Sequence, residues 1–166
     1  DAMMNNIMVD TDVVLLRQKV AHARKVGVGQ KEYRVRGESG AKFLERADNW
    51  AEEVTAARNR ASAALNEGLK QKAKDLDVTA LRNDGINAAR KAGGIDSKLI
   101  SRAEEHVKAV LKQREDAVKN VQAVRATTMA AQDTDALKSA ISQAVNAGVS
   151  HPSHKLSDGR MGVSFV

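Results

Sequence analysis

The sequence contains an internal repeat, and this repeat constrains the fold more than any other feature. Lys98–Glu104 (KLISRAE) is similar to Lys42–Asp48 (KFLERAD), which lies 56 residues earlier. A second pattern, Leu16–Val28, aligns without gaps with Leu137–Val149, and Leu81–Gly93 matches both after one inserted residue is allowed. Self-similarity of this kind indicates a protein built from stacked copies of one supersecondary unit.

Two long segments carry apolar residues at alternating spacings of three and four, which predicts helices over about 41–74 and 97–129. Proline does not interrupt either segment, since Pro152 is the only proline in the chain. The second pattern is broken by a charged residue, Arg114. The expected buried positions are Phe43, Ala47, Trp50, Val54, Ala57, Ala61, Ala64 and Gly68 in the first helix, and Ile100, Ala103, Val107, Val110, Ala117, Val121, Val124 and Thr128 in the second.

Short helices are predicted at about 12–26, 77–92 and 133–147, each followed by glycine, on which helices commonly end. Asp77 and Asp96 are expected to cap the helices that follow them. The chain is therefore predicted to be all-α, with about five alternating short and long helices that form stacked helical hairpins or an elongated bundle. Each hairpin has to bury its apolar stripe against a neighbour.

The organisation predicted from these patterns is an extended arm at 1–11, one helical repeat domain at 12–150 and an irregular tail at 151–166. The connection 27–40 is expected to be a loop or a short irregular strand. The alternation of apolar residues at the end of the tail predicts a strand, or a peptide, laid across another surface. The candidate partner-binding residues are Met3, Met4, Ile7, Met8, Arg34, Arg36, Met161, Val163 and Phe165.

The amino-acid composition excludes several kinds of functional site. The chain has no cysteine, which excludes disulfides, a thiolate nucleophile and a Cys-ligated zinc site, and it has no apolar run long enough to span a membrane. Aromatic residues make up only 2% of the 166 residues, so alanine-rich helices are expected to pack closely while burying little area per contact. The net charge of +6 permits an acidic partner, although acids and bases alternate along the helices.

No catalytic or cofactor motif is recognisable. His151 and His154 lie three residues apart with Asp158 nearby, but they flank a proline in a polar loop, which favours ordinary loop histidines over a metal site. The serines lack a nucleophile-elbow context, and the glycine pairs lack the spacing of a phosphate-binding loop. Neither Glu52 nor Glu53 has a histidine three residues on, as a carboxylate di-metal site requires. We therefore expect a protein that is not an enzyme, with no metal and no cofactor.

The order of these motifs resembles a known kind of repeat. Asp-x-x-Ala-Leu occurs at Asp77–Leu81 and Asp133–Leu137, Ile-x-x-Ala-x-x-Ala-Gly-Val follows at Ile141–Val149, and Lys98–Glu104 opens a long Ala/Glu/Lys/Arg helix. This arrangement resembles helical-hairpin repeat proteins of dinoflagellates and related algae. The resemblance covers about residues 12–150 and implies a non-enzymatic accessory module, such as an extrinsic or linker subunit of a plastid photosystem or its antenna.

The expected function is a structural subunit that docks onto other proteins of a larger complex, peripheral to a membrane, through its helical surface and its apolar termini. The alternative is a basic subunit that binds nucleic acid or belongs to a ribonucleoprotein. The sequence starts at Asp1, without an initiator methionine, so either a targeting peptide has been removed or the numbering begins inside a longer product. We weigh the first interpretation for localisation. It favours an organelle, with the plastid stroma or the thylakoid lumen side as the specific expectation and the cytoplasm as the alternative.

Overall fold

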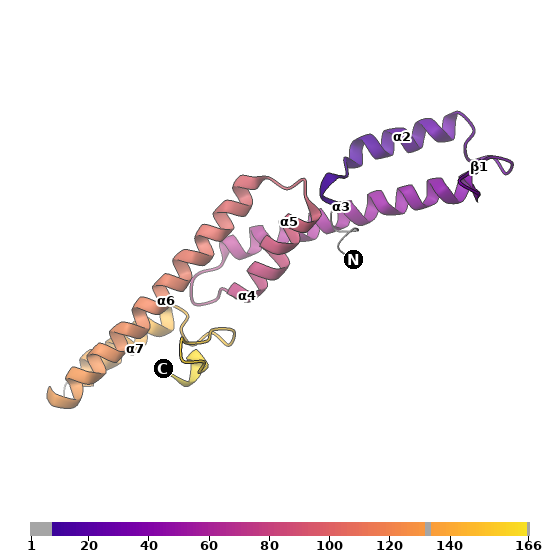
Figure 1. The fold of residues 1–166 in the computed structure, drawn as a ribbon. Helices are drawn as coiled ribbons and strands as arrows, with labels where there is room; N and C mark the ends of the chain where they lie inside the picture. Colours follow the sequence, from indigo (N-terminus) through magenta and orange to yellow (C-terminus); the bar gives the residue numbers. More distant parts are fainter. Residues whose placement is uncertain (1–7, 132–133, 166) are drawn as a thin grey trace. The chain divides into compact units, whose positions relative to one another are not determined.

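The computed structural model describes residues 8–131 and 134–165. It is 72% helical, and the described residues contain only one very small sheet (Figure 1). The predicted all-α fold with alternating short and long helices is thus confirmed.

The long helices are α3 (Gly40–Lys70) and α6 (Ser97–Ala131). The first and last short helices are α2 (Val13–Lys25) and α7 (Thr134–Asn146), and the middle one is continuous from α4 (Val78–Ala80) through a π-helix (Leu81–Asn87) to α5 (Ala88–Ala92). Asp12 caps α2 and Asp77 caps α4, each through a carboxylate that accepts backbone N–H groups of the first turn.

The connection between α2 and α3 contains a tight antiparallel hairpin, as the sequence allowed. Strand β1 (Arg34–Val35) pairs with β2 (Glu38–Ser39), and Arg36 in the turn has a φ of +50°. Gly40 then starts α3 directly against the chain before the hairpin, where a Cβ atom would lie 1.7 Å from the Val28 carbonyl oxygen. Only glycine permits this close approach.

The chain divides into two compact units. The first contains residues up to 62 together with 87–95, and the second contains 63–86 together with 96–166. In this grouping the segment before α2 belongs to the first unit and the tail to the second. The organisation into an arm at 1–11, a repeat domain at 12–150 and a tail at 151–166 stays a prediction. Residues 8–10, which were predicted to be part of an extended arm, form one helical turn.

The core of the first unit consists mainly of small aliphatic side chains. It departs from the predicted seam of α3 near the start of that helix, whereas Val54 and Ala61 are buried as predicted. Phe43 was expected to be buried but is 38% exposed, whereas its neighbour Leu44 is 3% exposed. A straight helix drifts relative to a strict seven-residue pattern, so the buried stripe passes onto the flanking apolar positions. The buried residues of this unit are Val20, Leu44, Ala51, Val54, Ala61, Ala89 and Ala92.

The second unit follows the predicted seam of α6 more closely, since Ala103, Val107, Val110 and Val121 are all buried.

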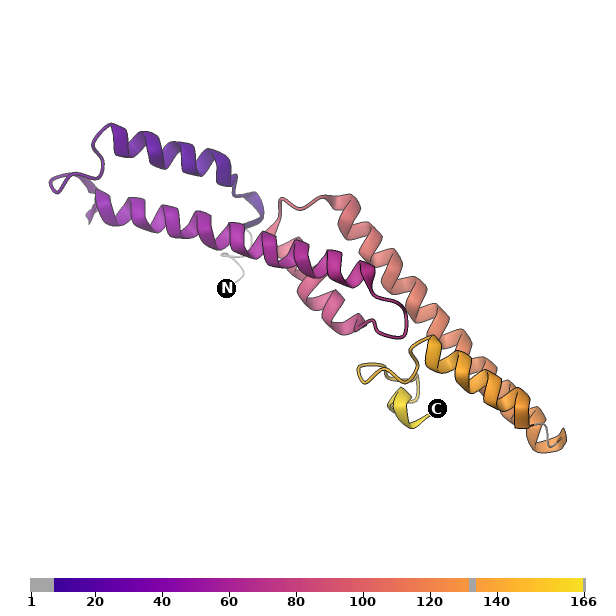
Figure 2. The same ribbon diagram turned by 180° about the vertical axis from the view of Figure 1, so that it is seen from behind.

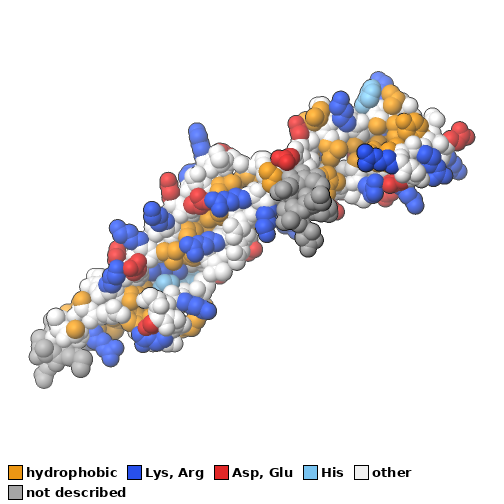
Figure 3. Space-filling view, viewed as in Figure 1, with side chains coloured by type: hydrophobic (Ala, Val, Ile, Leu, Met, Phe, Trp, Pro, Cys, Tyr) orange, Lys and Arg blue, Asp and Glu red, His pale blue; other side chains and the backbone are white. Residues whose placement is uncertain are grey.

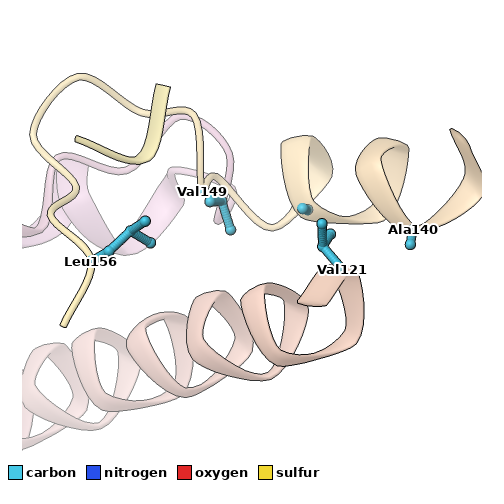
Figure 4. Packing of buried hydrophobic residues seen from close by; sticks show 5 residues of the cluster. Val121, Ala140, Val149 and Leu156 are labelled. Carbon is cyan, nitrogen blue, oxygen red and sulfur yellow. The ribbon is translucent and has the colours of Figure 1, made fainter. Parts of the chain in front are cut away.

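Helix α7 runs alongside α6 (Figures 1 and 2). One cluster joins them to the tail and is formed by Val121 of α6, Ala140 and Ala144 of α7, and Val149 and Leu156 beyond α7 (Figure 4).

The π-helix at Leu81–Asn87 has a visible origin in the sequence. The middle short helix has one residue more than the other two between its first leucine and its closing glycine. A single extra residue in an α-helix is commonly accommodated as a π-turn. Leu81 and Ile86, at either end of this turn, are therefore both buried, as the repeat requires, while Arg82, Asn83 and Asp84 lie exposed between them.

The tail does not form the predicted strand. Lys155 and Met161 make one isolated antiparallel bridge, and Gly162–Ser164 then forms a 3-10 turn. Gly162 donates its N–H to the His154 carbonyl at 2.9 Å, and a Cβ atom there would lie 1.8 Å from the Val149 carbonyl oxygen. The alternation from Met161 to Phe165 is therefore folded back by a glycine that packs against the chain.

Candidate functional site

The most unusual side chain of the second unit is Arg114, the residue that interrupts the apolar seam of α6. It is 1% exposed. Its Nη2 donates to the carbonyl oxygens of Ala73 and Leu76, both at 2.8 Å, and its Nε donates to that of Ala147 at 3.3 Å. The Ala147 carbonyl lies just beyond the C-terminal end of α7, and those of Ala73 and Leu76 lie in the connection between α3 and α4. The guanidinium thus supplies hydrogen bonds to backbone carbonyls outside the helices.

The first unit contains the same arrangement around Arg58 of α3. Its Nη2 donates to the carbonyl oxygens of Met8, at 3.3 Å, and Thr11, at 2.9 Å, and its Nε donates to that of Ala92 at 3.1 Å. Arg58 precedes Arg114 by 56 residues, the repeat distance of the long helices. Its acceptors correspond as well: Met8 and Thr11 each lie 65 residues before an Arg114 acceptor, as Leu16 precedes Leu81.

We call these two networks the arginine junctions. Each joins the middle of a long helix to the segment that leads into the preceding short helix and to the end of the following one. The glycines that close the short helices make room for them. A Cβ atom on Gly93 would lie 2.6 Å from the Val9 carbonyl oxygen, and one on Gly148 would lie 2.3 Å from that of Ala73.

A group of polar side chains surrounds the Arg114 junction. Ser153 hydrogen-bonds to Asp77, and its Oγ lies 2.8 Å from Nδ1 of His151. The pKa of Asp77 is lowered, chiefly by the Ala80 N–H that its carboxylate accepts. Burial lowers the pKa of His154, and the positive charge of Arg114 lowers it further. The group therefore favours an ionised Asp77 and a neutral His154.

Asp77, His151 and Ser153 are the three residue types of a serine-hydrolase catalytic triad. Their hydrogen bonds, however, differ from those of a triad and hold a loop in place. In a catalytic triad the carboxylate orients the histidine, and the histidine takes the serine proton. Here the Asp77 carboxylate accepts two helix N–H groups and bonds to Ser153, while Nδ1 of His151 accepts the backbone N–H of Ser153 at 3.2 Å. The arrangement pins the C-terminal loop to the start of α4.

A groove of about 320 Å³ lies between α6 and this loop. Apolar side chains from both sides line it, and lysine and histidine side chains stand around them. Glu115 and Lys119 form an ion pair across one turn of α6, with 2.7 Å between Oε1 and Nζ. The lining residues are Leu111, Glu115, Val118, Lys119 and Gln122 of α6, and His154, Lys155, Leu156 and Ser157 of the loop.

The predicted partner-binding residues that the structure describes are divided between the two units. Met3, Met4 and Ile7 lie outside the described residues. Met8 is half-buried in the Arg58 junction, and Arg34 and Arg36 are exposed in the β-hairpin. In the second unit, Met161 is half-buried, Val163 is 57% exposed, and Phe165 packs against the α6–α7 cluster. The apolar end of the tail thus has an internal partner.

Neither the arginine junctions nor the groove was predicted from the sequence. One signal for the junctions was present, because Arg114 interrupts the apolar seam of α6 and another arginine, Arg58, lies one repeat distance before it. No sequence pattern marked the groove, since its second wall is an irregular loop.

Within the described ranges, no three His, Asp or Glu side chains gather closely enough to hold a metal ion. None of the helices in this part of the chain has both the length and the apolar character needed to cross a bilayer.

These features define a class, an all-α helical-hairpin repeat with an arginine at the centre of each unit. Comparison of the sequence with protein-family models, with curated proteins and with solved structures gives no match. The particular function therefore has to be argued from the chain itself.

Proposed function

We propose that this chain is a non-catalytic structural subunit that docks onto another protein in a larger assembly. The observation that carries the proposal is the repeated arginine junction. A buried arginine in the second unit and a partly buried one in the first join the long helices to backbone carbonyls of neighbouring segments, whereas an enzyme uses such groups on a substrate. A framework of this kind provides a rigid helical surface for binding.

Exposed apolar side chains support docking through the first unit. Val14 and Leu15 on α2 are 67% and 48% exposed, and Val26, just past its end, is 62% exposed. Beside α2, Leu15, Leu16 and Trp50 line a shallow depression with Asp10 and Lys19. Exposed apolar groups of this kind, rimmed by charges, are typical of protein-binding surfaces. Arg34 and Arg36 of the same unit add positive charge nearby in the sequence.

The specific partner that we propose, a plastid photosystem or antenna complex in an organelle, rests on the resemblance to algal helical-hairpin repeats. The test is gentle gel filtration of native extract followed by identification of the co-eluting proteins. We expect the chain to migrate with a large complex. Elution alone at its own mass of 17.9 kDa would overturn the docking proposal.

Variants locate the surface within that experiment. Replacing Val14 and Leu15 together by Glu should release the chain from the complex, because two charges then oppose burial of the α2 surface. Val145→Glu on α7 is the matched control, since Val145 is also exposed, at 42%, but belongs to the other unit. If both variants still co-elute with the complex, or if both are released from it, docking through α2 is contradicted.

A nucleic-acid-binding subunit is the second candidate, favoured by the net charge of +6. On the face shown in Figure 3, basic and acidic side chains are interspersed, which weakens this alternative. Binding to RNA or DNA through phosphates must weaken steeply as salt is raised. Saturable binding at low salt with such a slope would favour this candidate over the structural subunit.

A further inference from the structure

The groove beside α6 has no counterpart of the same character on α3, although the two helices are repeats of each other. Leu111 and Val118 line the groove, and the residues 56 positions earlier are Thr55 and Ser62. Thr55 donates its hydroxyl to the Ala51 carbonyl at 2.7 Å. The second unit therefore carries apolar side chains on a stripe where the first carries hydroxyl groups.

The other wall of the groove is preformed by the loop itself. Leu156 is only 9% exposed and belongs to the α6–α7 cluster (Figure 4). Its N–H donates to the Arg160 carbonyl at 2.9 Å, and the Gly162 N–H donates to that of His154 at 2.9 Å. A wall held by these bonds loses little conformational freedom when a ligand enters.

The rim of the groove carries an excess of positive charge. Glu115 is its one acid and is paired with Lys119, whereas Lys155 makes no ion pair with the described residues. A ligand that complements this rim has one negative group. A ligand that complements the floor has a flexible apolar part of modest size, since the volume of about 320 Å³ is at the lower end for small-molecule sites.

We propose that this groove binds a medium-chain fatty carboxylate, with its tail against Leu111, Val118 and Leu156 and its carboxylate near Lys155. This site is independent of the docking function proposed above, because it lies in the second unit and uses none of the α2 surface.

The test is calorimetric titration of the intact chain with decanoate at neutral pH and low salt. We expect one site with a Kd of about 100 µM, a value reasonable for a ligand of this size. Decyltrimethylammonium, with a tail of the same length and the opposite charge, should bind at least about tenfold more weakly because Lys155 repels it. Equal affinities for the two compounds would overturn the proposal, as would the absence of saturation by decanoate at about 2 mM.

Two variants test the named residues. The double variant Leu111→Thr and Val118→Ser installs the residues that α3 carries at the equivalent positions, and it should weaken decanoate binding at least about tenfold through lost apolar contact. Val163→Ser, which changes an exposed residue outside the groove, should bind like the native chain. Unchanged affinity in the double variant would overturn the proposal. If the double variant does not fold, Lys155→Gln provides the test. This substitution should reduce the preference of the groove for decanoate over decyltrimethylammonium, and an unchanged preference would overturn the proposal.

Discussion

The two arginine junctions have the same bonds in different surroundings. Arg58 and Arg114 each donate to three carbonyl oxygens at equivalent places in the repeat. Arg114 is 1% exposed, however, whereas Arg58 is only partly buried. The comparison shows that the hydrogen-bond pattern belongs to the repeat, while its contribution to stability is set by how far each unit excludes water.

A second polar contact, close to the arginine junctions in the repeat, is present in the first unit and absent from the equivalent positions of the second. Trp50 donates its indole N–H to the Thr11 hydroxyl at 3.2 Å in the first unit. The equivalent residues of the second unit are His106 and Leu76, and buried Nε2 of His106 has no hydrogen-bond partner among the described residues. A polar contact has thus been lost in the unit that buries its arginine more deeply.

A large effect is expected from the loss of Arg114. Arg114→Leu leaves three carbonyl oxygens without their donor in a buried site and should lower the free energy of unfolding by about 3 kcal/mol. Arg58→Leu should cost only about 1 kcal/mol, because water can reach that junction. Urea unfolding followed by circular dichroism measures both. Equal losses would show that burial does not distinguish the junctions.

The second comparison uses two glycines of the second unit with similar backbone angles. Gly148 and Gly159 have φ values of +81° and +84°, but only Gly148 lies against other atoms, so that Gly159 has open space around its Cα. Gly159→Ala should cost about 1 kcal/mol through backbone strain alone. Gly148→Ala should cost about 2 to 3 kcal/mol, since the new methyl group also displaces the Ala73 carbonyl from Arg114. Thermal unfolding of both variants gives the difference.

The third comparison tests the origin of the π-helix. Deleting exposed Asn83 restores the residue count of the other short helices and should convert the π-turn to α-helix at a cost of about 1 kcal/mol. Deleting exposed Ser139 from α7, which has no extra residue, should cost about 3 kcal/mol or more because it turns Leu137 away from Ala140 and Ala144. Similar losses for the two deletions, measured by urea unfolding, would refute the insertion origin.

The fourth prediction concerns pH and the loop beside Arg114. The pKa of His154 is lower in the folded chain than its ordinary value of 6.5, so the unfolded chain takes up a proton more readily. Stability contributed by neutral His154 is therefore fully present above pH 6.5 and is lost as the pH falls below it, by less than about 1 kcal/mol. Unfolding between pH 7 and 5 should depend less on pH in His154→Gln. Identical pH dependence in both chains would contradict this assignment.

Small effects of opposite sign are expected at the Trp50 and His106 pair. His106→Leu removes a buried polar atom that lacks a partner and should raise stability by about 0.5 kcal/mol. Trp50→Phe removes a satisfied hydrogen bond and should lower it by about 1 kcal/mol. Opposite signs in urea unfolding would support the comparison, and a loss in both variants would contradict it.

Much of the helical framework was predictable, because helix positions depend on local patterns. The spacing of apolar residues and the predicted capping residues Asp77 and Asp96 act within one or two turns. For this reason α2, α3, α6 and α7 lie close to their predicted bounds. The candidate site was not predictable in the same way. Apolar residues at both ends of the chain predicted docking surfaces, yet Phe165 packs within its own unit.

The all-α class, the order of short and long helices and the repeat distances follow from the amino-acid sequence, because they depend on periodicity and capping. The partners of Arg58 and Arg114 become visible in the fold alone, because their acceptors are backbone carbonyls, which every residue carries and no sequence pattern marks. The tertiary structure also decided which face of α6 the tail covers. Glycine contacts at Gly148 and Gly162 direct that loop, and they depend on segments far apart along the chain.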